Sequence, residues 1–158
     1  MESVYIETTI PSYLAAHPSS QEVMAQHQRF THQWWNSERS RFRLFTSFLV
    51  RFEASRGDPG AAARRMVYLE NIPDLDVPLE TEALSQNLIR LLRIPQKAEA
   101  GATHLALTIL HRMTYLLTWN CTHLANPVLQ KELIEFCQYH QLHVPVICTP
   151  ELLISEPL

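Results

Sequence analysis

Apolar positions along the chain recur with two different spacings. Short runs rich in β-branched or aromatic residues alternate with longer stretches in which apolar residues return every three or four positions. The short runs predict strands, and the longer stretches predict amphipathic helices. The predicted strands are 4–7, 44–47, 75–77, 115–119 and 146–147. The predicted helices are 12–14, 21–37, 48–55, 59–71, 80–92, 97–112 and 127–140.

Several predicted helix starts share one sequence motif, a capping side chain followed by proline. It occurs at Asp58-Pro59, Asn126-Pro127 and Thr149-Pro150. A side-chain oxygen at the cap accepts a free backbone N–H, and proline suits the first helical position because its missing N–H has no partner there anyway. These dipeptides therefore fix element boundaries.

Alternation of strands with helices predicts an α/β fold with a mainly parallel sheet of about five strands, covered by helices as a three-layer α/β/α arrangement. The 158 residues and the hydrophobic fraction of 46% suit one domain, which we expect to span residues 1–158. Only 3 glycines are present, and no low-complexity linker divides the chain.

The net charge and the absence of membrane or export signals argue against several classes of protein. The net charge of −3 argues against a protein that coats nucleic acid through bulk positive charge. No apolar run approaches the ~20 residues that span a bilayer, and the N-terminus lacks the basic and apolar regions of a signal peptide. We therefore expect a cytoplasmic protein without a membrane contact, whose three cysteines are reduced thiols.

Arginines are concentrated in one part of the chain. Seven of the 13 lysines and arginines lie between Arg39 and Arg65, and Trp34, Trp35 and Phe42 stand near the start of that stretch. Two interpretations stay open for them. They form solvated helix faces, or they form a rim that contacts phosphate groups.

Glu7 ends the first predicted strand and is followed by a segment that can begin a helix. In open α/β sheets, ligands bind beyond the carboxyl ends of the strands. A carboxylate at that place, joined by further carboxylates from other strand ends, provides the oxygen ligands that hard divalent cations prefer.

Four stretches in this order resemble the PIN-domain nucleases, and among them the toxin (VapC-like) branch, over essentially the whole chain. They are VYIETTIPSYL (4–14), FEASRGD (52–58), KAEAGATHLA (97–106) and LLTWNCTH (116–123). The resemblance implies an acidic pocket that binds Mg²⁺ or Mn²⁺ and hydrolyses RNA phosphodiester bonds. A bound metal can activate water and neutralise charge on the phosphate.

The resemblance assigns four positions to the acidic pocket. Glu7 stands at the first position, where the family usually carries aspartate, and Glu53 stands at the second. Gly101 stands where the third aspartate is expected, and Asn120 occupies the fourth position, so Glu7, Glu53 and Asn120 would hold the metal. Because cation affinity follows ligand charge, we expect weakened catalysis.

Four further residues are candidates to support this pocket. Thr118 would present a hydroxyl near a strand end, and Ser47 would hydrogen-bond Glu7 from the end of the second strand. His104 lies three positions after Gly101 and so shares its helix face. Glu99 should point away from that face, unless the helix begins later and leaves it in a flexible first turn.

Kinship to toxins also implies an RNA substrate, a small antitoxin protein whose segment covers the pocket, and a homodimer. The leading alternative is a PIN-like domain that has lost hydrolysis and serves as an RNA-binding or protein-interaction module. Gly101 and Asn120 favour this alternative, because neither supplies the charge of the acid it replaces.

Two competing sites use cysteine. Zinc would require ligands from the set Cys121, His123, Cys137, His140, His143 and Cys148, but no Cys-x₂-Cys pair is present. A nucleophilic thiolate would require Cys121 beside His123. The chain carries no glycine-rich phosphate loop, nucleophile elbow or kinase signature.

Overall fold

A computed structural model, which describes residues 1–155, contains one parallel four-stranded sheet in the order β2-β1-β3-β4. The strands are β1 (Ser3–Ile6), β2 (Arg43–Phe45), β3 (Tyr115–Leu117) and β4 (Val146–Cys148). The central strand β1 pairs Val4 with Leu44 on one side and with Tyr115 on the other. Parallel neighbours need crossover connections, so helices separate the strands along the chain.

Seven α-helices account for these connections within residues 1–155. They are α1 (Thr9–Ala15), α2 (Glu22–Ser37), α3 (Phe48–Ala54), α4 (Pro59–Leu69), α5 (Thr81–Leu92), α6 (Glu99–Leu110) and α7 (Pro127–Tyr139). Three short 3₁₀ helices are η1 (Arg39–Arg41), η2 (Gln96–Ala98) and η3 (Pro150–Leu153). The predicted α/β class is confirmed.

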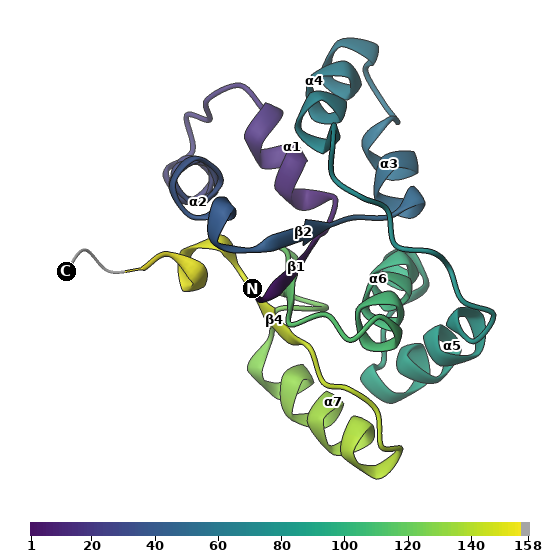
Figure 1. The fold of residues 1–158 in the computed structure, drawn as a ribbon. Helices are drawn as coiled ribbons and strands as arrows, with labels where there is room; N and C mark the ends of the chain where they lie inside the picture. Colours follow the sequence, from purple (N-terminus) through teal and green to yellow (C-terminus); the bar gives the residue numbers. More distant parts are fainter. Residues whose placement is uncertain (156–158) are drawn as a thin grey trace.

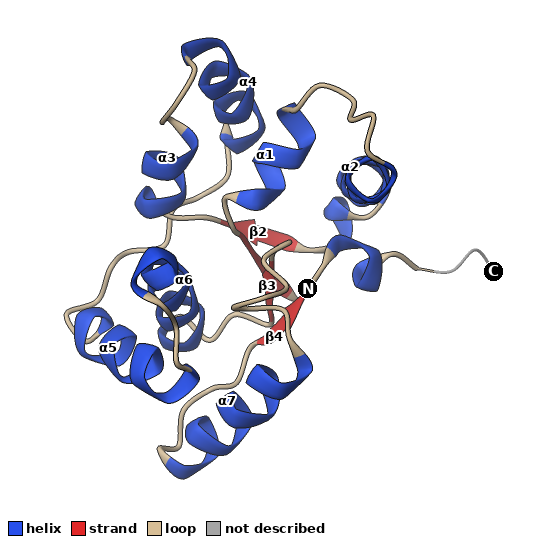
Figure 2. Cartoon of the chain, turned by 180° about the vertical axis from the view of Figure 1, so that it is seen from behind, coloured by secondary structure: helices blue, strands red, loops and turns tan. Residues whose placement is uncertain are grey.

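Helices lie on more than one side of the sheet. Figure 1 shows α1 and α2 to one side of the strands and α5 and α6 to the other, and Figure 2 shows the same arrangement from behind. All four residues of β1 are buried, as expected for a central strand covered by helices. Tyr5, Leu105 and Leu116 are fully buried, so the core lies where α6 meets β1 and β3.

The prediction of a fifth strand at 75–77 is wrong. The chain makes only an isolated parallel bridge there, between Asp74 and Thr46 beyond the end of β2. Thr46 N–H donates to the Pro73 carbonyl at 2.9 Å, and Leu75 N–H donates to the Thr46 carbonyl at 2.8 Å. Proline has no N–H for a ladder, and Pro73 and Pro78 bracket this segment, so the pairing cannot extend.

Two of the three capping dipeptides perform as predicted. Asp58 accepts the Ala61 N–H at 2.9 Å, and Asn126 accepts the Val128 N–H at 3.0 Å, so α4 and α7 begin at the expected prolines. After Thr149 the chain forms only the short helix η3, and the Thr149 hydroxyl donates to the Glu151 carboxylate at 3.3 Å instead.

Two boundaries near the candidate site differ from the predictions. Helix α1 begins at Thr9 rather than at residue 12, because Pro11 is tolerated in a first turn. Helix α6 begins at Glu99, and the residues before it form η2. Within residues 1–155, no helix combines the length and apolarity needed to cross a membrane.

Candidate functional site

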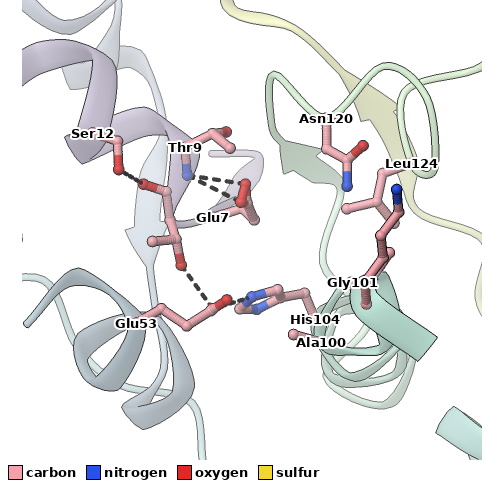
Figure 3. Close-up of a pocket in the computed structure, with 12 residues that line it drawn as sticks. Glu7, Thr9, Ser12, Glu53, Ala100, Gly101, His104, Asn120 and Leu124 are labelled. Atoms are coloured by element: carbon pink, nitrogen blue, oxygen red, sulfur yellow. Dashed lines mark hydrogen bonds and ion pairs between the residues drawn. The ribbon is translucent and has the colours of Figure 1, made fainter. Parts of the chain in front are cut away.

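A pocket of about 430 Å³ opens beyond the carboxyl ends of β1 and β3, between α1, α3 and α6 (Figure 3). Its lining consists of Glu7, Thr8, Thr9, Ser12, Glu53, Lys97, Ala98, Ala100, Gly101, His104, Asn120 and Leu124. The four positions assigned by resemblance, Glu7, Glu53, Gly101 and Asn120, therefore lie around one cavity, although they are far apart in sequence.

Glu7 is buried and is held by neutral hydrogen-bond donors. Both of its carboxylate oxygens accept the Thr9 N–H at 3.0 Å, and Oε1 also accepts the Thr118 hydroxyl at 2.9 Å. Thr118 in turn accepts the Asn120 N–H at 3.0 Å, and the Thr9 hydroxyl accepts the Trp119 N–H at 2.8 Å. These bonds join the loop after β1 to the loop after β3 and fix the carboxylate.

Glu53 reaches the pocket from α3 and is half-buried. Its Oε1 accepts the Thr8 hydroxyl at 2.8 Å and pairs with His104 Nε2 at 2.6 Å. Burial acts to raise the pKa of Glu53, but the hydrogen bond and charge of His104 and the bond from Thr8 outweigh it and lower that pKa below its ordinary value. Glu53 is therefore ionised and anchored.

A buried hydrogen-bond relay runs behind Glu53. Tyr5 Oη lies 2.7 Å from His104 Nδ1 and 2.7 Å from Ser47 Oγ, which also accepts the Val50 N–H at 3.3 Å. A carboxylate only accepts, so His104 Nε2 carries a proton. His104 therefore joins the relay to the pocket: Nε2 donates to Glu53, while Nδ1 shares a hydrogen bond with the Tyr5 hydroxyl, which in turn bonds Ser47. Burial strongly raises the pKa of Tyr5 and keeps its proton in place.

Ser47 does not play the predicted part. It was expected to hydrogen-bond Glu7 from the end of the second strand, but it bonds Tyr5 and caps α3. The reason is that β2 already ends at Phe45, so Ser47 belongs to the start of the next helix. His104 shares the pocket with Gly101 as expected, and its partner is Glu53.

Gly101 is buried and leaves the position that the resemblance assigns to a third acid without a side chain. A Cβ atom built there would lie 3.6 Å from the side chain of Leu124, an ordinary van der Waals contact. Glu99 does not fill the place: it stands in the first turn of α6, is exposed and does not line the pocket. Two positions before Gly101 on a helix, it points to a different face.

Asn120 borders the pocket with its amide, and the Oδ1 atom accepts the His123 N–H at 3.0 Å. This bond closes the turn that leads from β3 toward α7. Figure 3 shows the amide nitrogen of Asn120 on the pocket side. To ligate a metal, the oxygen would have to leave its bond to His123, whereas the amide N–H₂, which makes no hydrogen bond within residues 1–155, can donate to an anion.

Lys97 is the cation that the pocket brings beside these acids. It lines the pocket from η2, and within residues 1–155 no carboxylate forms a salt bridge with it. The arginines of 39–65 do not line the cavity. Arg51 is paired with Asp74 at 2.8 Å, and Arg65 donates to the Ala54 carbonyl at 2.8 Å, so both serve the fold.

The cysteines do not assemble a site. Cys137 and Cys148 are buried, which raises the pKa of their thiols to about 11 and about 12. Burial and the charge of Glu151 also raise the pKa of Cys121, the opposite of what a nucleophilic thiolate needs. Within residues 1–155, no group of three or more His, Cys, Asp and Glu side chains is arranged to hold a metal by itself.

Acid should weaken the fold through Glu53. Because its pKa is lowered in the folded chain, its contribution to stability is present above the ordinary value of 4.5 and is lost as pH falls below it. We expect Glu53→Gln to lose less free energy of unfolding than the unaltered chain when pH falls from 7 to about 3.5. Urea titrations at both pH values measure this, with Glu99→Gln as the control. Equal losses in all three proteins would remove Glu53 from the acid response.

Four residues of the site were not predicted from the sequence: Tyr5, Thr8, Thr9 and Lys97. Tyr5 had a usable signal, since residues two apart on a strand share a face, so Tyr5 lies on the face of Glu7. Thr8 and Thr9 directly follow Glu7, where a turn brings backbone and hydroxyl donors back to the carboxylate. Lys97 had no local signal, because only the fold brings η2 to the mouth of the pocket.

Taken together, the pocket offers two carboxylates for a hard cation and an amide and an ammonium for an anion. Mg²⁺ keeps several waters and often binds through one or two carboxylates plus substrate phosphates. Within residues 1–155, the hydrogen bonds of Glu53 all use Oε1 and those of Glu7 come from neutral donors, so Glu53 keeps Oε2 for a cation and Glu7 has no cationic partner. No protein-family model matches this chain, and no curated protein matches its sequence.

Proposed function

We propose that this chain is a PIN-like domain of the toxin ribonuclease branch, a divalent-metal-dependent endoribonuclease with weakened activity. The observation that supports the proposal is that Glu7 and Glu53 line one pocket at the carboxyl edge of a parallel sheet. This is where open α/β sheets place their ligands. Gly101 and Asn120 border the same pocket at the two positions that the resemblance marks as degenerate.

The residues present fit a loosely held Mg²⁺ or Mn²⁺. Glu7 and Glu53 would hold the ion, and Asn120 would join them only by giving up its bond to His123. Without a side chain at Gly101, the remaining coordination would come from water and substrate phosphate. A divalent ion bound there would supply charge neutralisation at the phosphate and an activated water.

The other residues of the pocket orient the acids and the substrate. Thr9 and Thr118 fix the carboxylate of Glu7, and His104 fixes that of Glu53. The Asn120 amide can donate to a non-bridging phosphate oxygen, and Lys97 adds positive charge at the mouth of the pocket. These groups favour binding of a phosphodiester, while hydrolysis suffers from the missing third acid.

The proposal extends to features that the resemblance supplies. They are an RNA substrate, an antitoxin segment that covers the pocket, a homodimer, and a three-layer α/β/α arrangement around the sheet. A cytoplasmic location remains a prediction from the sequence.

A second candidate is a PIN-like module that binds RNA or a protein without cutting RNA. Leu124 favours it, because this apolar side chain packs against the place of the third acid. A cation site with Leu124 as a neighbour and Lys97 at its mouth is poorer than one ringed by acids. This candidate predicts RNA binding that does not depend on Mn²⁺.

Calorimetry with Mn²⁺ on the purified protein, paired with digestion of labelled RNA, tests the proposal. We expect weak Mn²⁺ binding and slow cleavage, both removed by Glu7→Gln, because this change takes away half of the carboxylate charge of the pocket. Glu99→Gln is the matched control, since Glu99 is an exposed acid near the pocket that does not line it. Cleavage that persists in Glu7→Gln would overturn the proposal, and RNA binding with no Mn²⁺ effect would favour the second candidate.

A further inference from the structure

A second depression adjoins the acidic pocket. It has a volume of about 350 Å³, and Ser12 lines both cavities. Its walls include Tyr13 and His17 from α1 and the loop after it, and Met24 from α2. Tyr13 follows Ser12 directly in the chain, so an aromatic ring stands one residue away from the wall of the acidic pocket.

Tyr13 is held in position by neighbouring rings. Its ring centroid lies 5.7 Å from that of Trp119 and 6.1 Å from that of His27. His27 stacks on Trp119 at 4.1 Å, and the Trp119 indole N–H donates to the Thr31 hydroxyl at 2.7 Å. Trp119 lies between Thr118, which binds Glu7, and Asn120. The ring of Tyr13 is therefore supported by Trp119, which belongs to the same loop as Thr118, the partner of Glu7, and Asn120, which lines the acidic pocket.

The loop that borders this depression is also fixed. Gln28 on α2 is buried; its amide donates to the His17 carbonyl at 3.0 Å and its oxygen accepts the Ser19 N–H at 2.9 Å. Both hydrogen bonds run from a helix to the loop between α1 and α2. The depression is preformed, which lowers the ordering cost of binding.

A third depression adjoins the second on the side of Arg29, which carries a positive charge. It shares Ala16, Ser19 and Gln28 with the second and adds Arg29 and His32. Arg29 pairs with Glu22 at 3.2 Å, but both side chains are mostly exposed, with 63% and 87% of their surface accessible. Exposed pairs of this kind contribute little, so Arg29 can exchange Glu22 for a phosphate.

We propose that Tyr13, with His17 and Met24, forms a nucleobase subsite for single-stranded RNA, next to the phosphate in the acidic pocket. Arg29 and His32 then face the following part of the backbone. The proposal rests on the proposed function and deepens it. The order of acidic pocket, aromatic wall and basic end matches a metal-bound phosphate, a base and a further phosphate, and aromatic rings stack on any base without sequence preference.

The test compares two fluorescent single-stranded RNA probes, one intact and one with an abasic residue at a single position, moved along the strand. Fluorescence anisotropy with Mn²⁺, and again in EDTA, gives the dissociation constants. For the unaltered chain, one abasic position should weaken binding by about tenfold, and Tyr13→Ala should weaken the intact probe as much while removing this difference. Tyr13→Phe should behave as the unaltered chain, because the ring remains.

Two further variants keep the test decisive. Met24→Glu changes a partly exposed wall residue, so it should fold normally, and its carboxylate should keep a base out of the depression and so reproduce the effect of Tyr13→Ala. Tyr139→Ala is the control: it removes a tyrosine that is 84% exposed on α7, and binding should not change.

The outcomes separate this inference from the proposed function. If the unaltered chain binds and cleaves RNA while Tyr13→Ala and Met24→Glu keep the abasic difference, the subsite is refuted and the ribonuclease proposal stands. If the folded, unaltered chain binds neither probe, the proposed function fails and the subsite fails with it. Loss of the abasic difference in Tyr13→Ala and Met24→Glu, but not in Tyr139→Ala, supports the subsite.

Discussion

Replacing Gly101 by aspartate is expected to raise Mn²⁺-dependent RNA cleavage by at least about tenfold, because even residues outside the ligand shell change metal affinity or activity by about 10–100-fold. Gly101 lines the same pocket as Glu7 and Glu53, so an aspartate there would add a third carboxylate to that pocket. The added Cβ would meet Leu124 at 3.6 Å, so the backbone need not move. Initial rates on a labelled RNA at fixed Mn²⁺ measure the gain.

Gly101→Ala is the matched control for this gain. It adds the same Cβ without a carboxylate, and it should stabilise α6 by up to about 1 kcal/mol, because glycine is a poor residue inside a helix. Its cleavage rate should equal that of the unaltered chain. Glu7→Gln in the Gly101→Asp background should abolish the gain. Equal rates in all of these proteins would show that the pocket does not cleave RNA.

Thr118→Val is expected to lower the free energy of unfolding by about 2–4 kcal/mol. The change keeps the shape of a fully buried side chain but removes a hydroxyl with two roles. It donates to Glu7 Oε1 at 2.9 Å and accepts the Asn120 N–H at 3.0 Å. Without it, a buried carboxylate loses a donor and a backbone N–H loses its acceptor, and both are costly to leave unpaired. Urea titration measures the loss.

Thr108→Val provides the comparison for this loss. Thr108 is also fully buried, but its hydroxyl donates to a neutral group, the Leu105 carbonyl, at 2.7 Å within α6. Its loss should cost about 1 kcal/mol. Mn²⁺ binding should weaken in Thr118→Val only, since that variant alone releases Glu7. If the two variants unfold at the same urea concentration, the bond to Glu7 contributes no special stability.

Local signals were sufficient for most elements of the fold. The caps at Asp58 and Asn126 act through bonds to residues two or three positions away, so the sequence contains all that they require. The segment 75–77 shows the limit of such signals. Its apolar residues resemble a strand, yet a strand also needs a partner with free N–H and C=O groups, and Pro73 interrupts the ladder after one bridge.

For the candidate site, too, some features could be predicted from the sequence and others could not. The positions of Glu7, Glu53, Gly101 and Asn120 came from the resemblance, and the structure brings all four to one pocket. The partners of the carboxylates could not be predicted. Ser47 was assigned to Glu7 but bonds Tyr5, because a change of two residues at the end of β2 moved it into a helix cap.

The sequence by itself determined the α/β class, most helix and strand positions, and the place of Glu7 directly after the first strand, since these depend on spacing and on contacts between near neighbours. Only the tertiary structure decided that His104 joins Tyr5 to Glu53, that Lys97 lines the same pocket, and that Leu124 lies beside Gly101. The physical reason is that the local sequence around a side chain does not specify which distant residue it will contact. Those partners are chosen when the sheet and its helices pack, because buried polar groups must find donors and acceptors wherever packing leaves them.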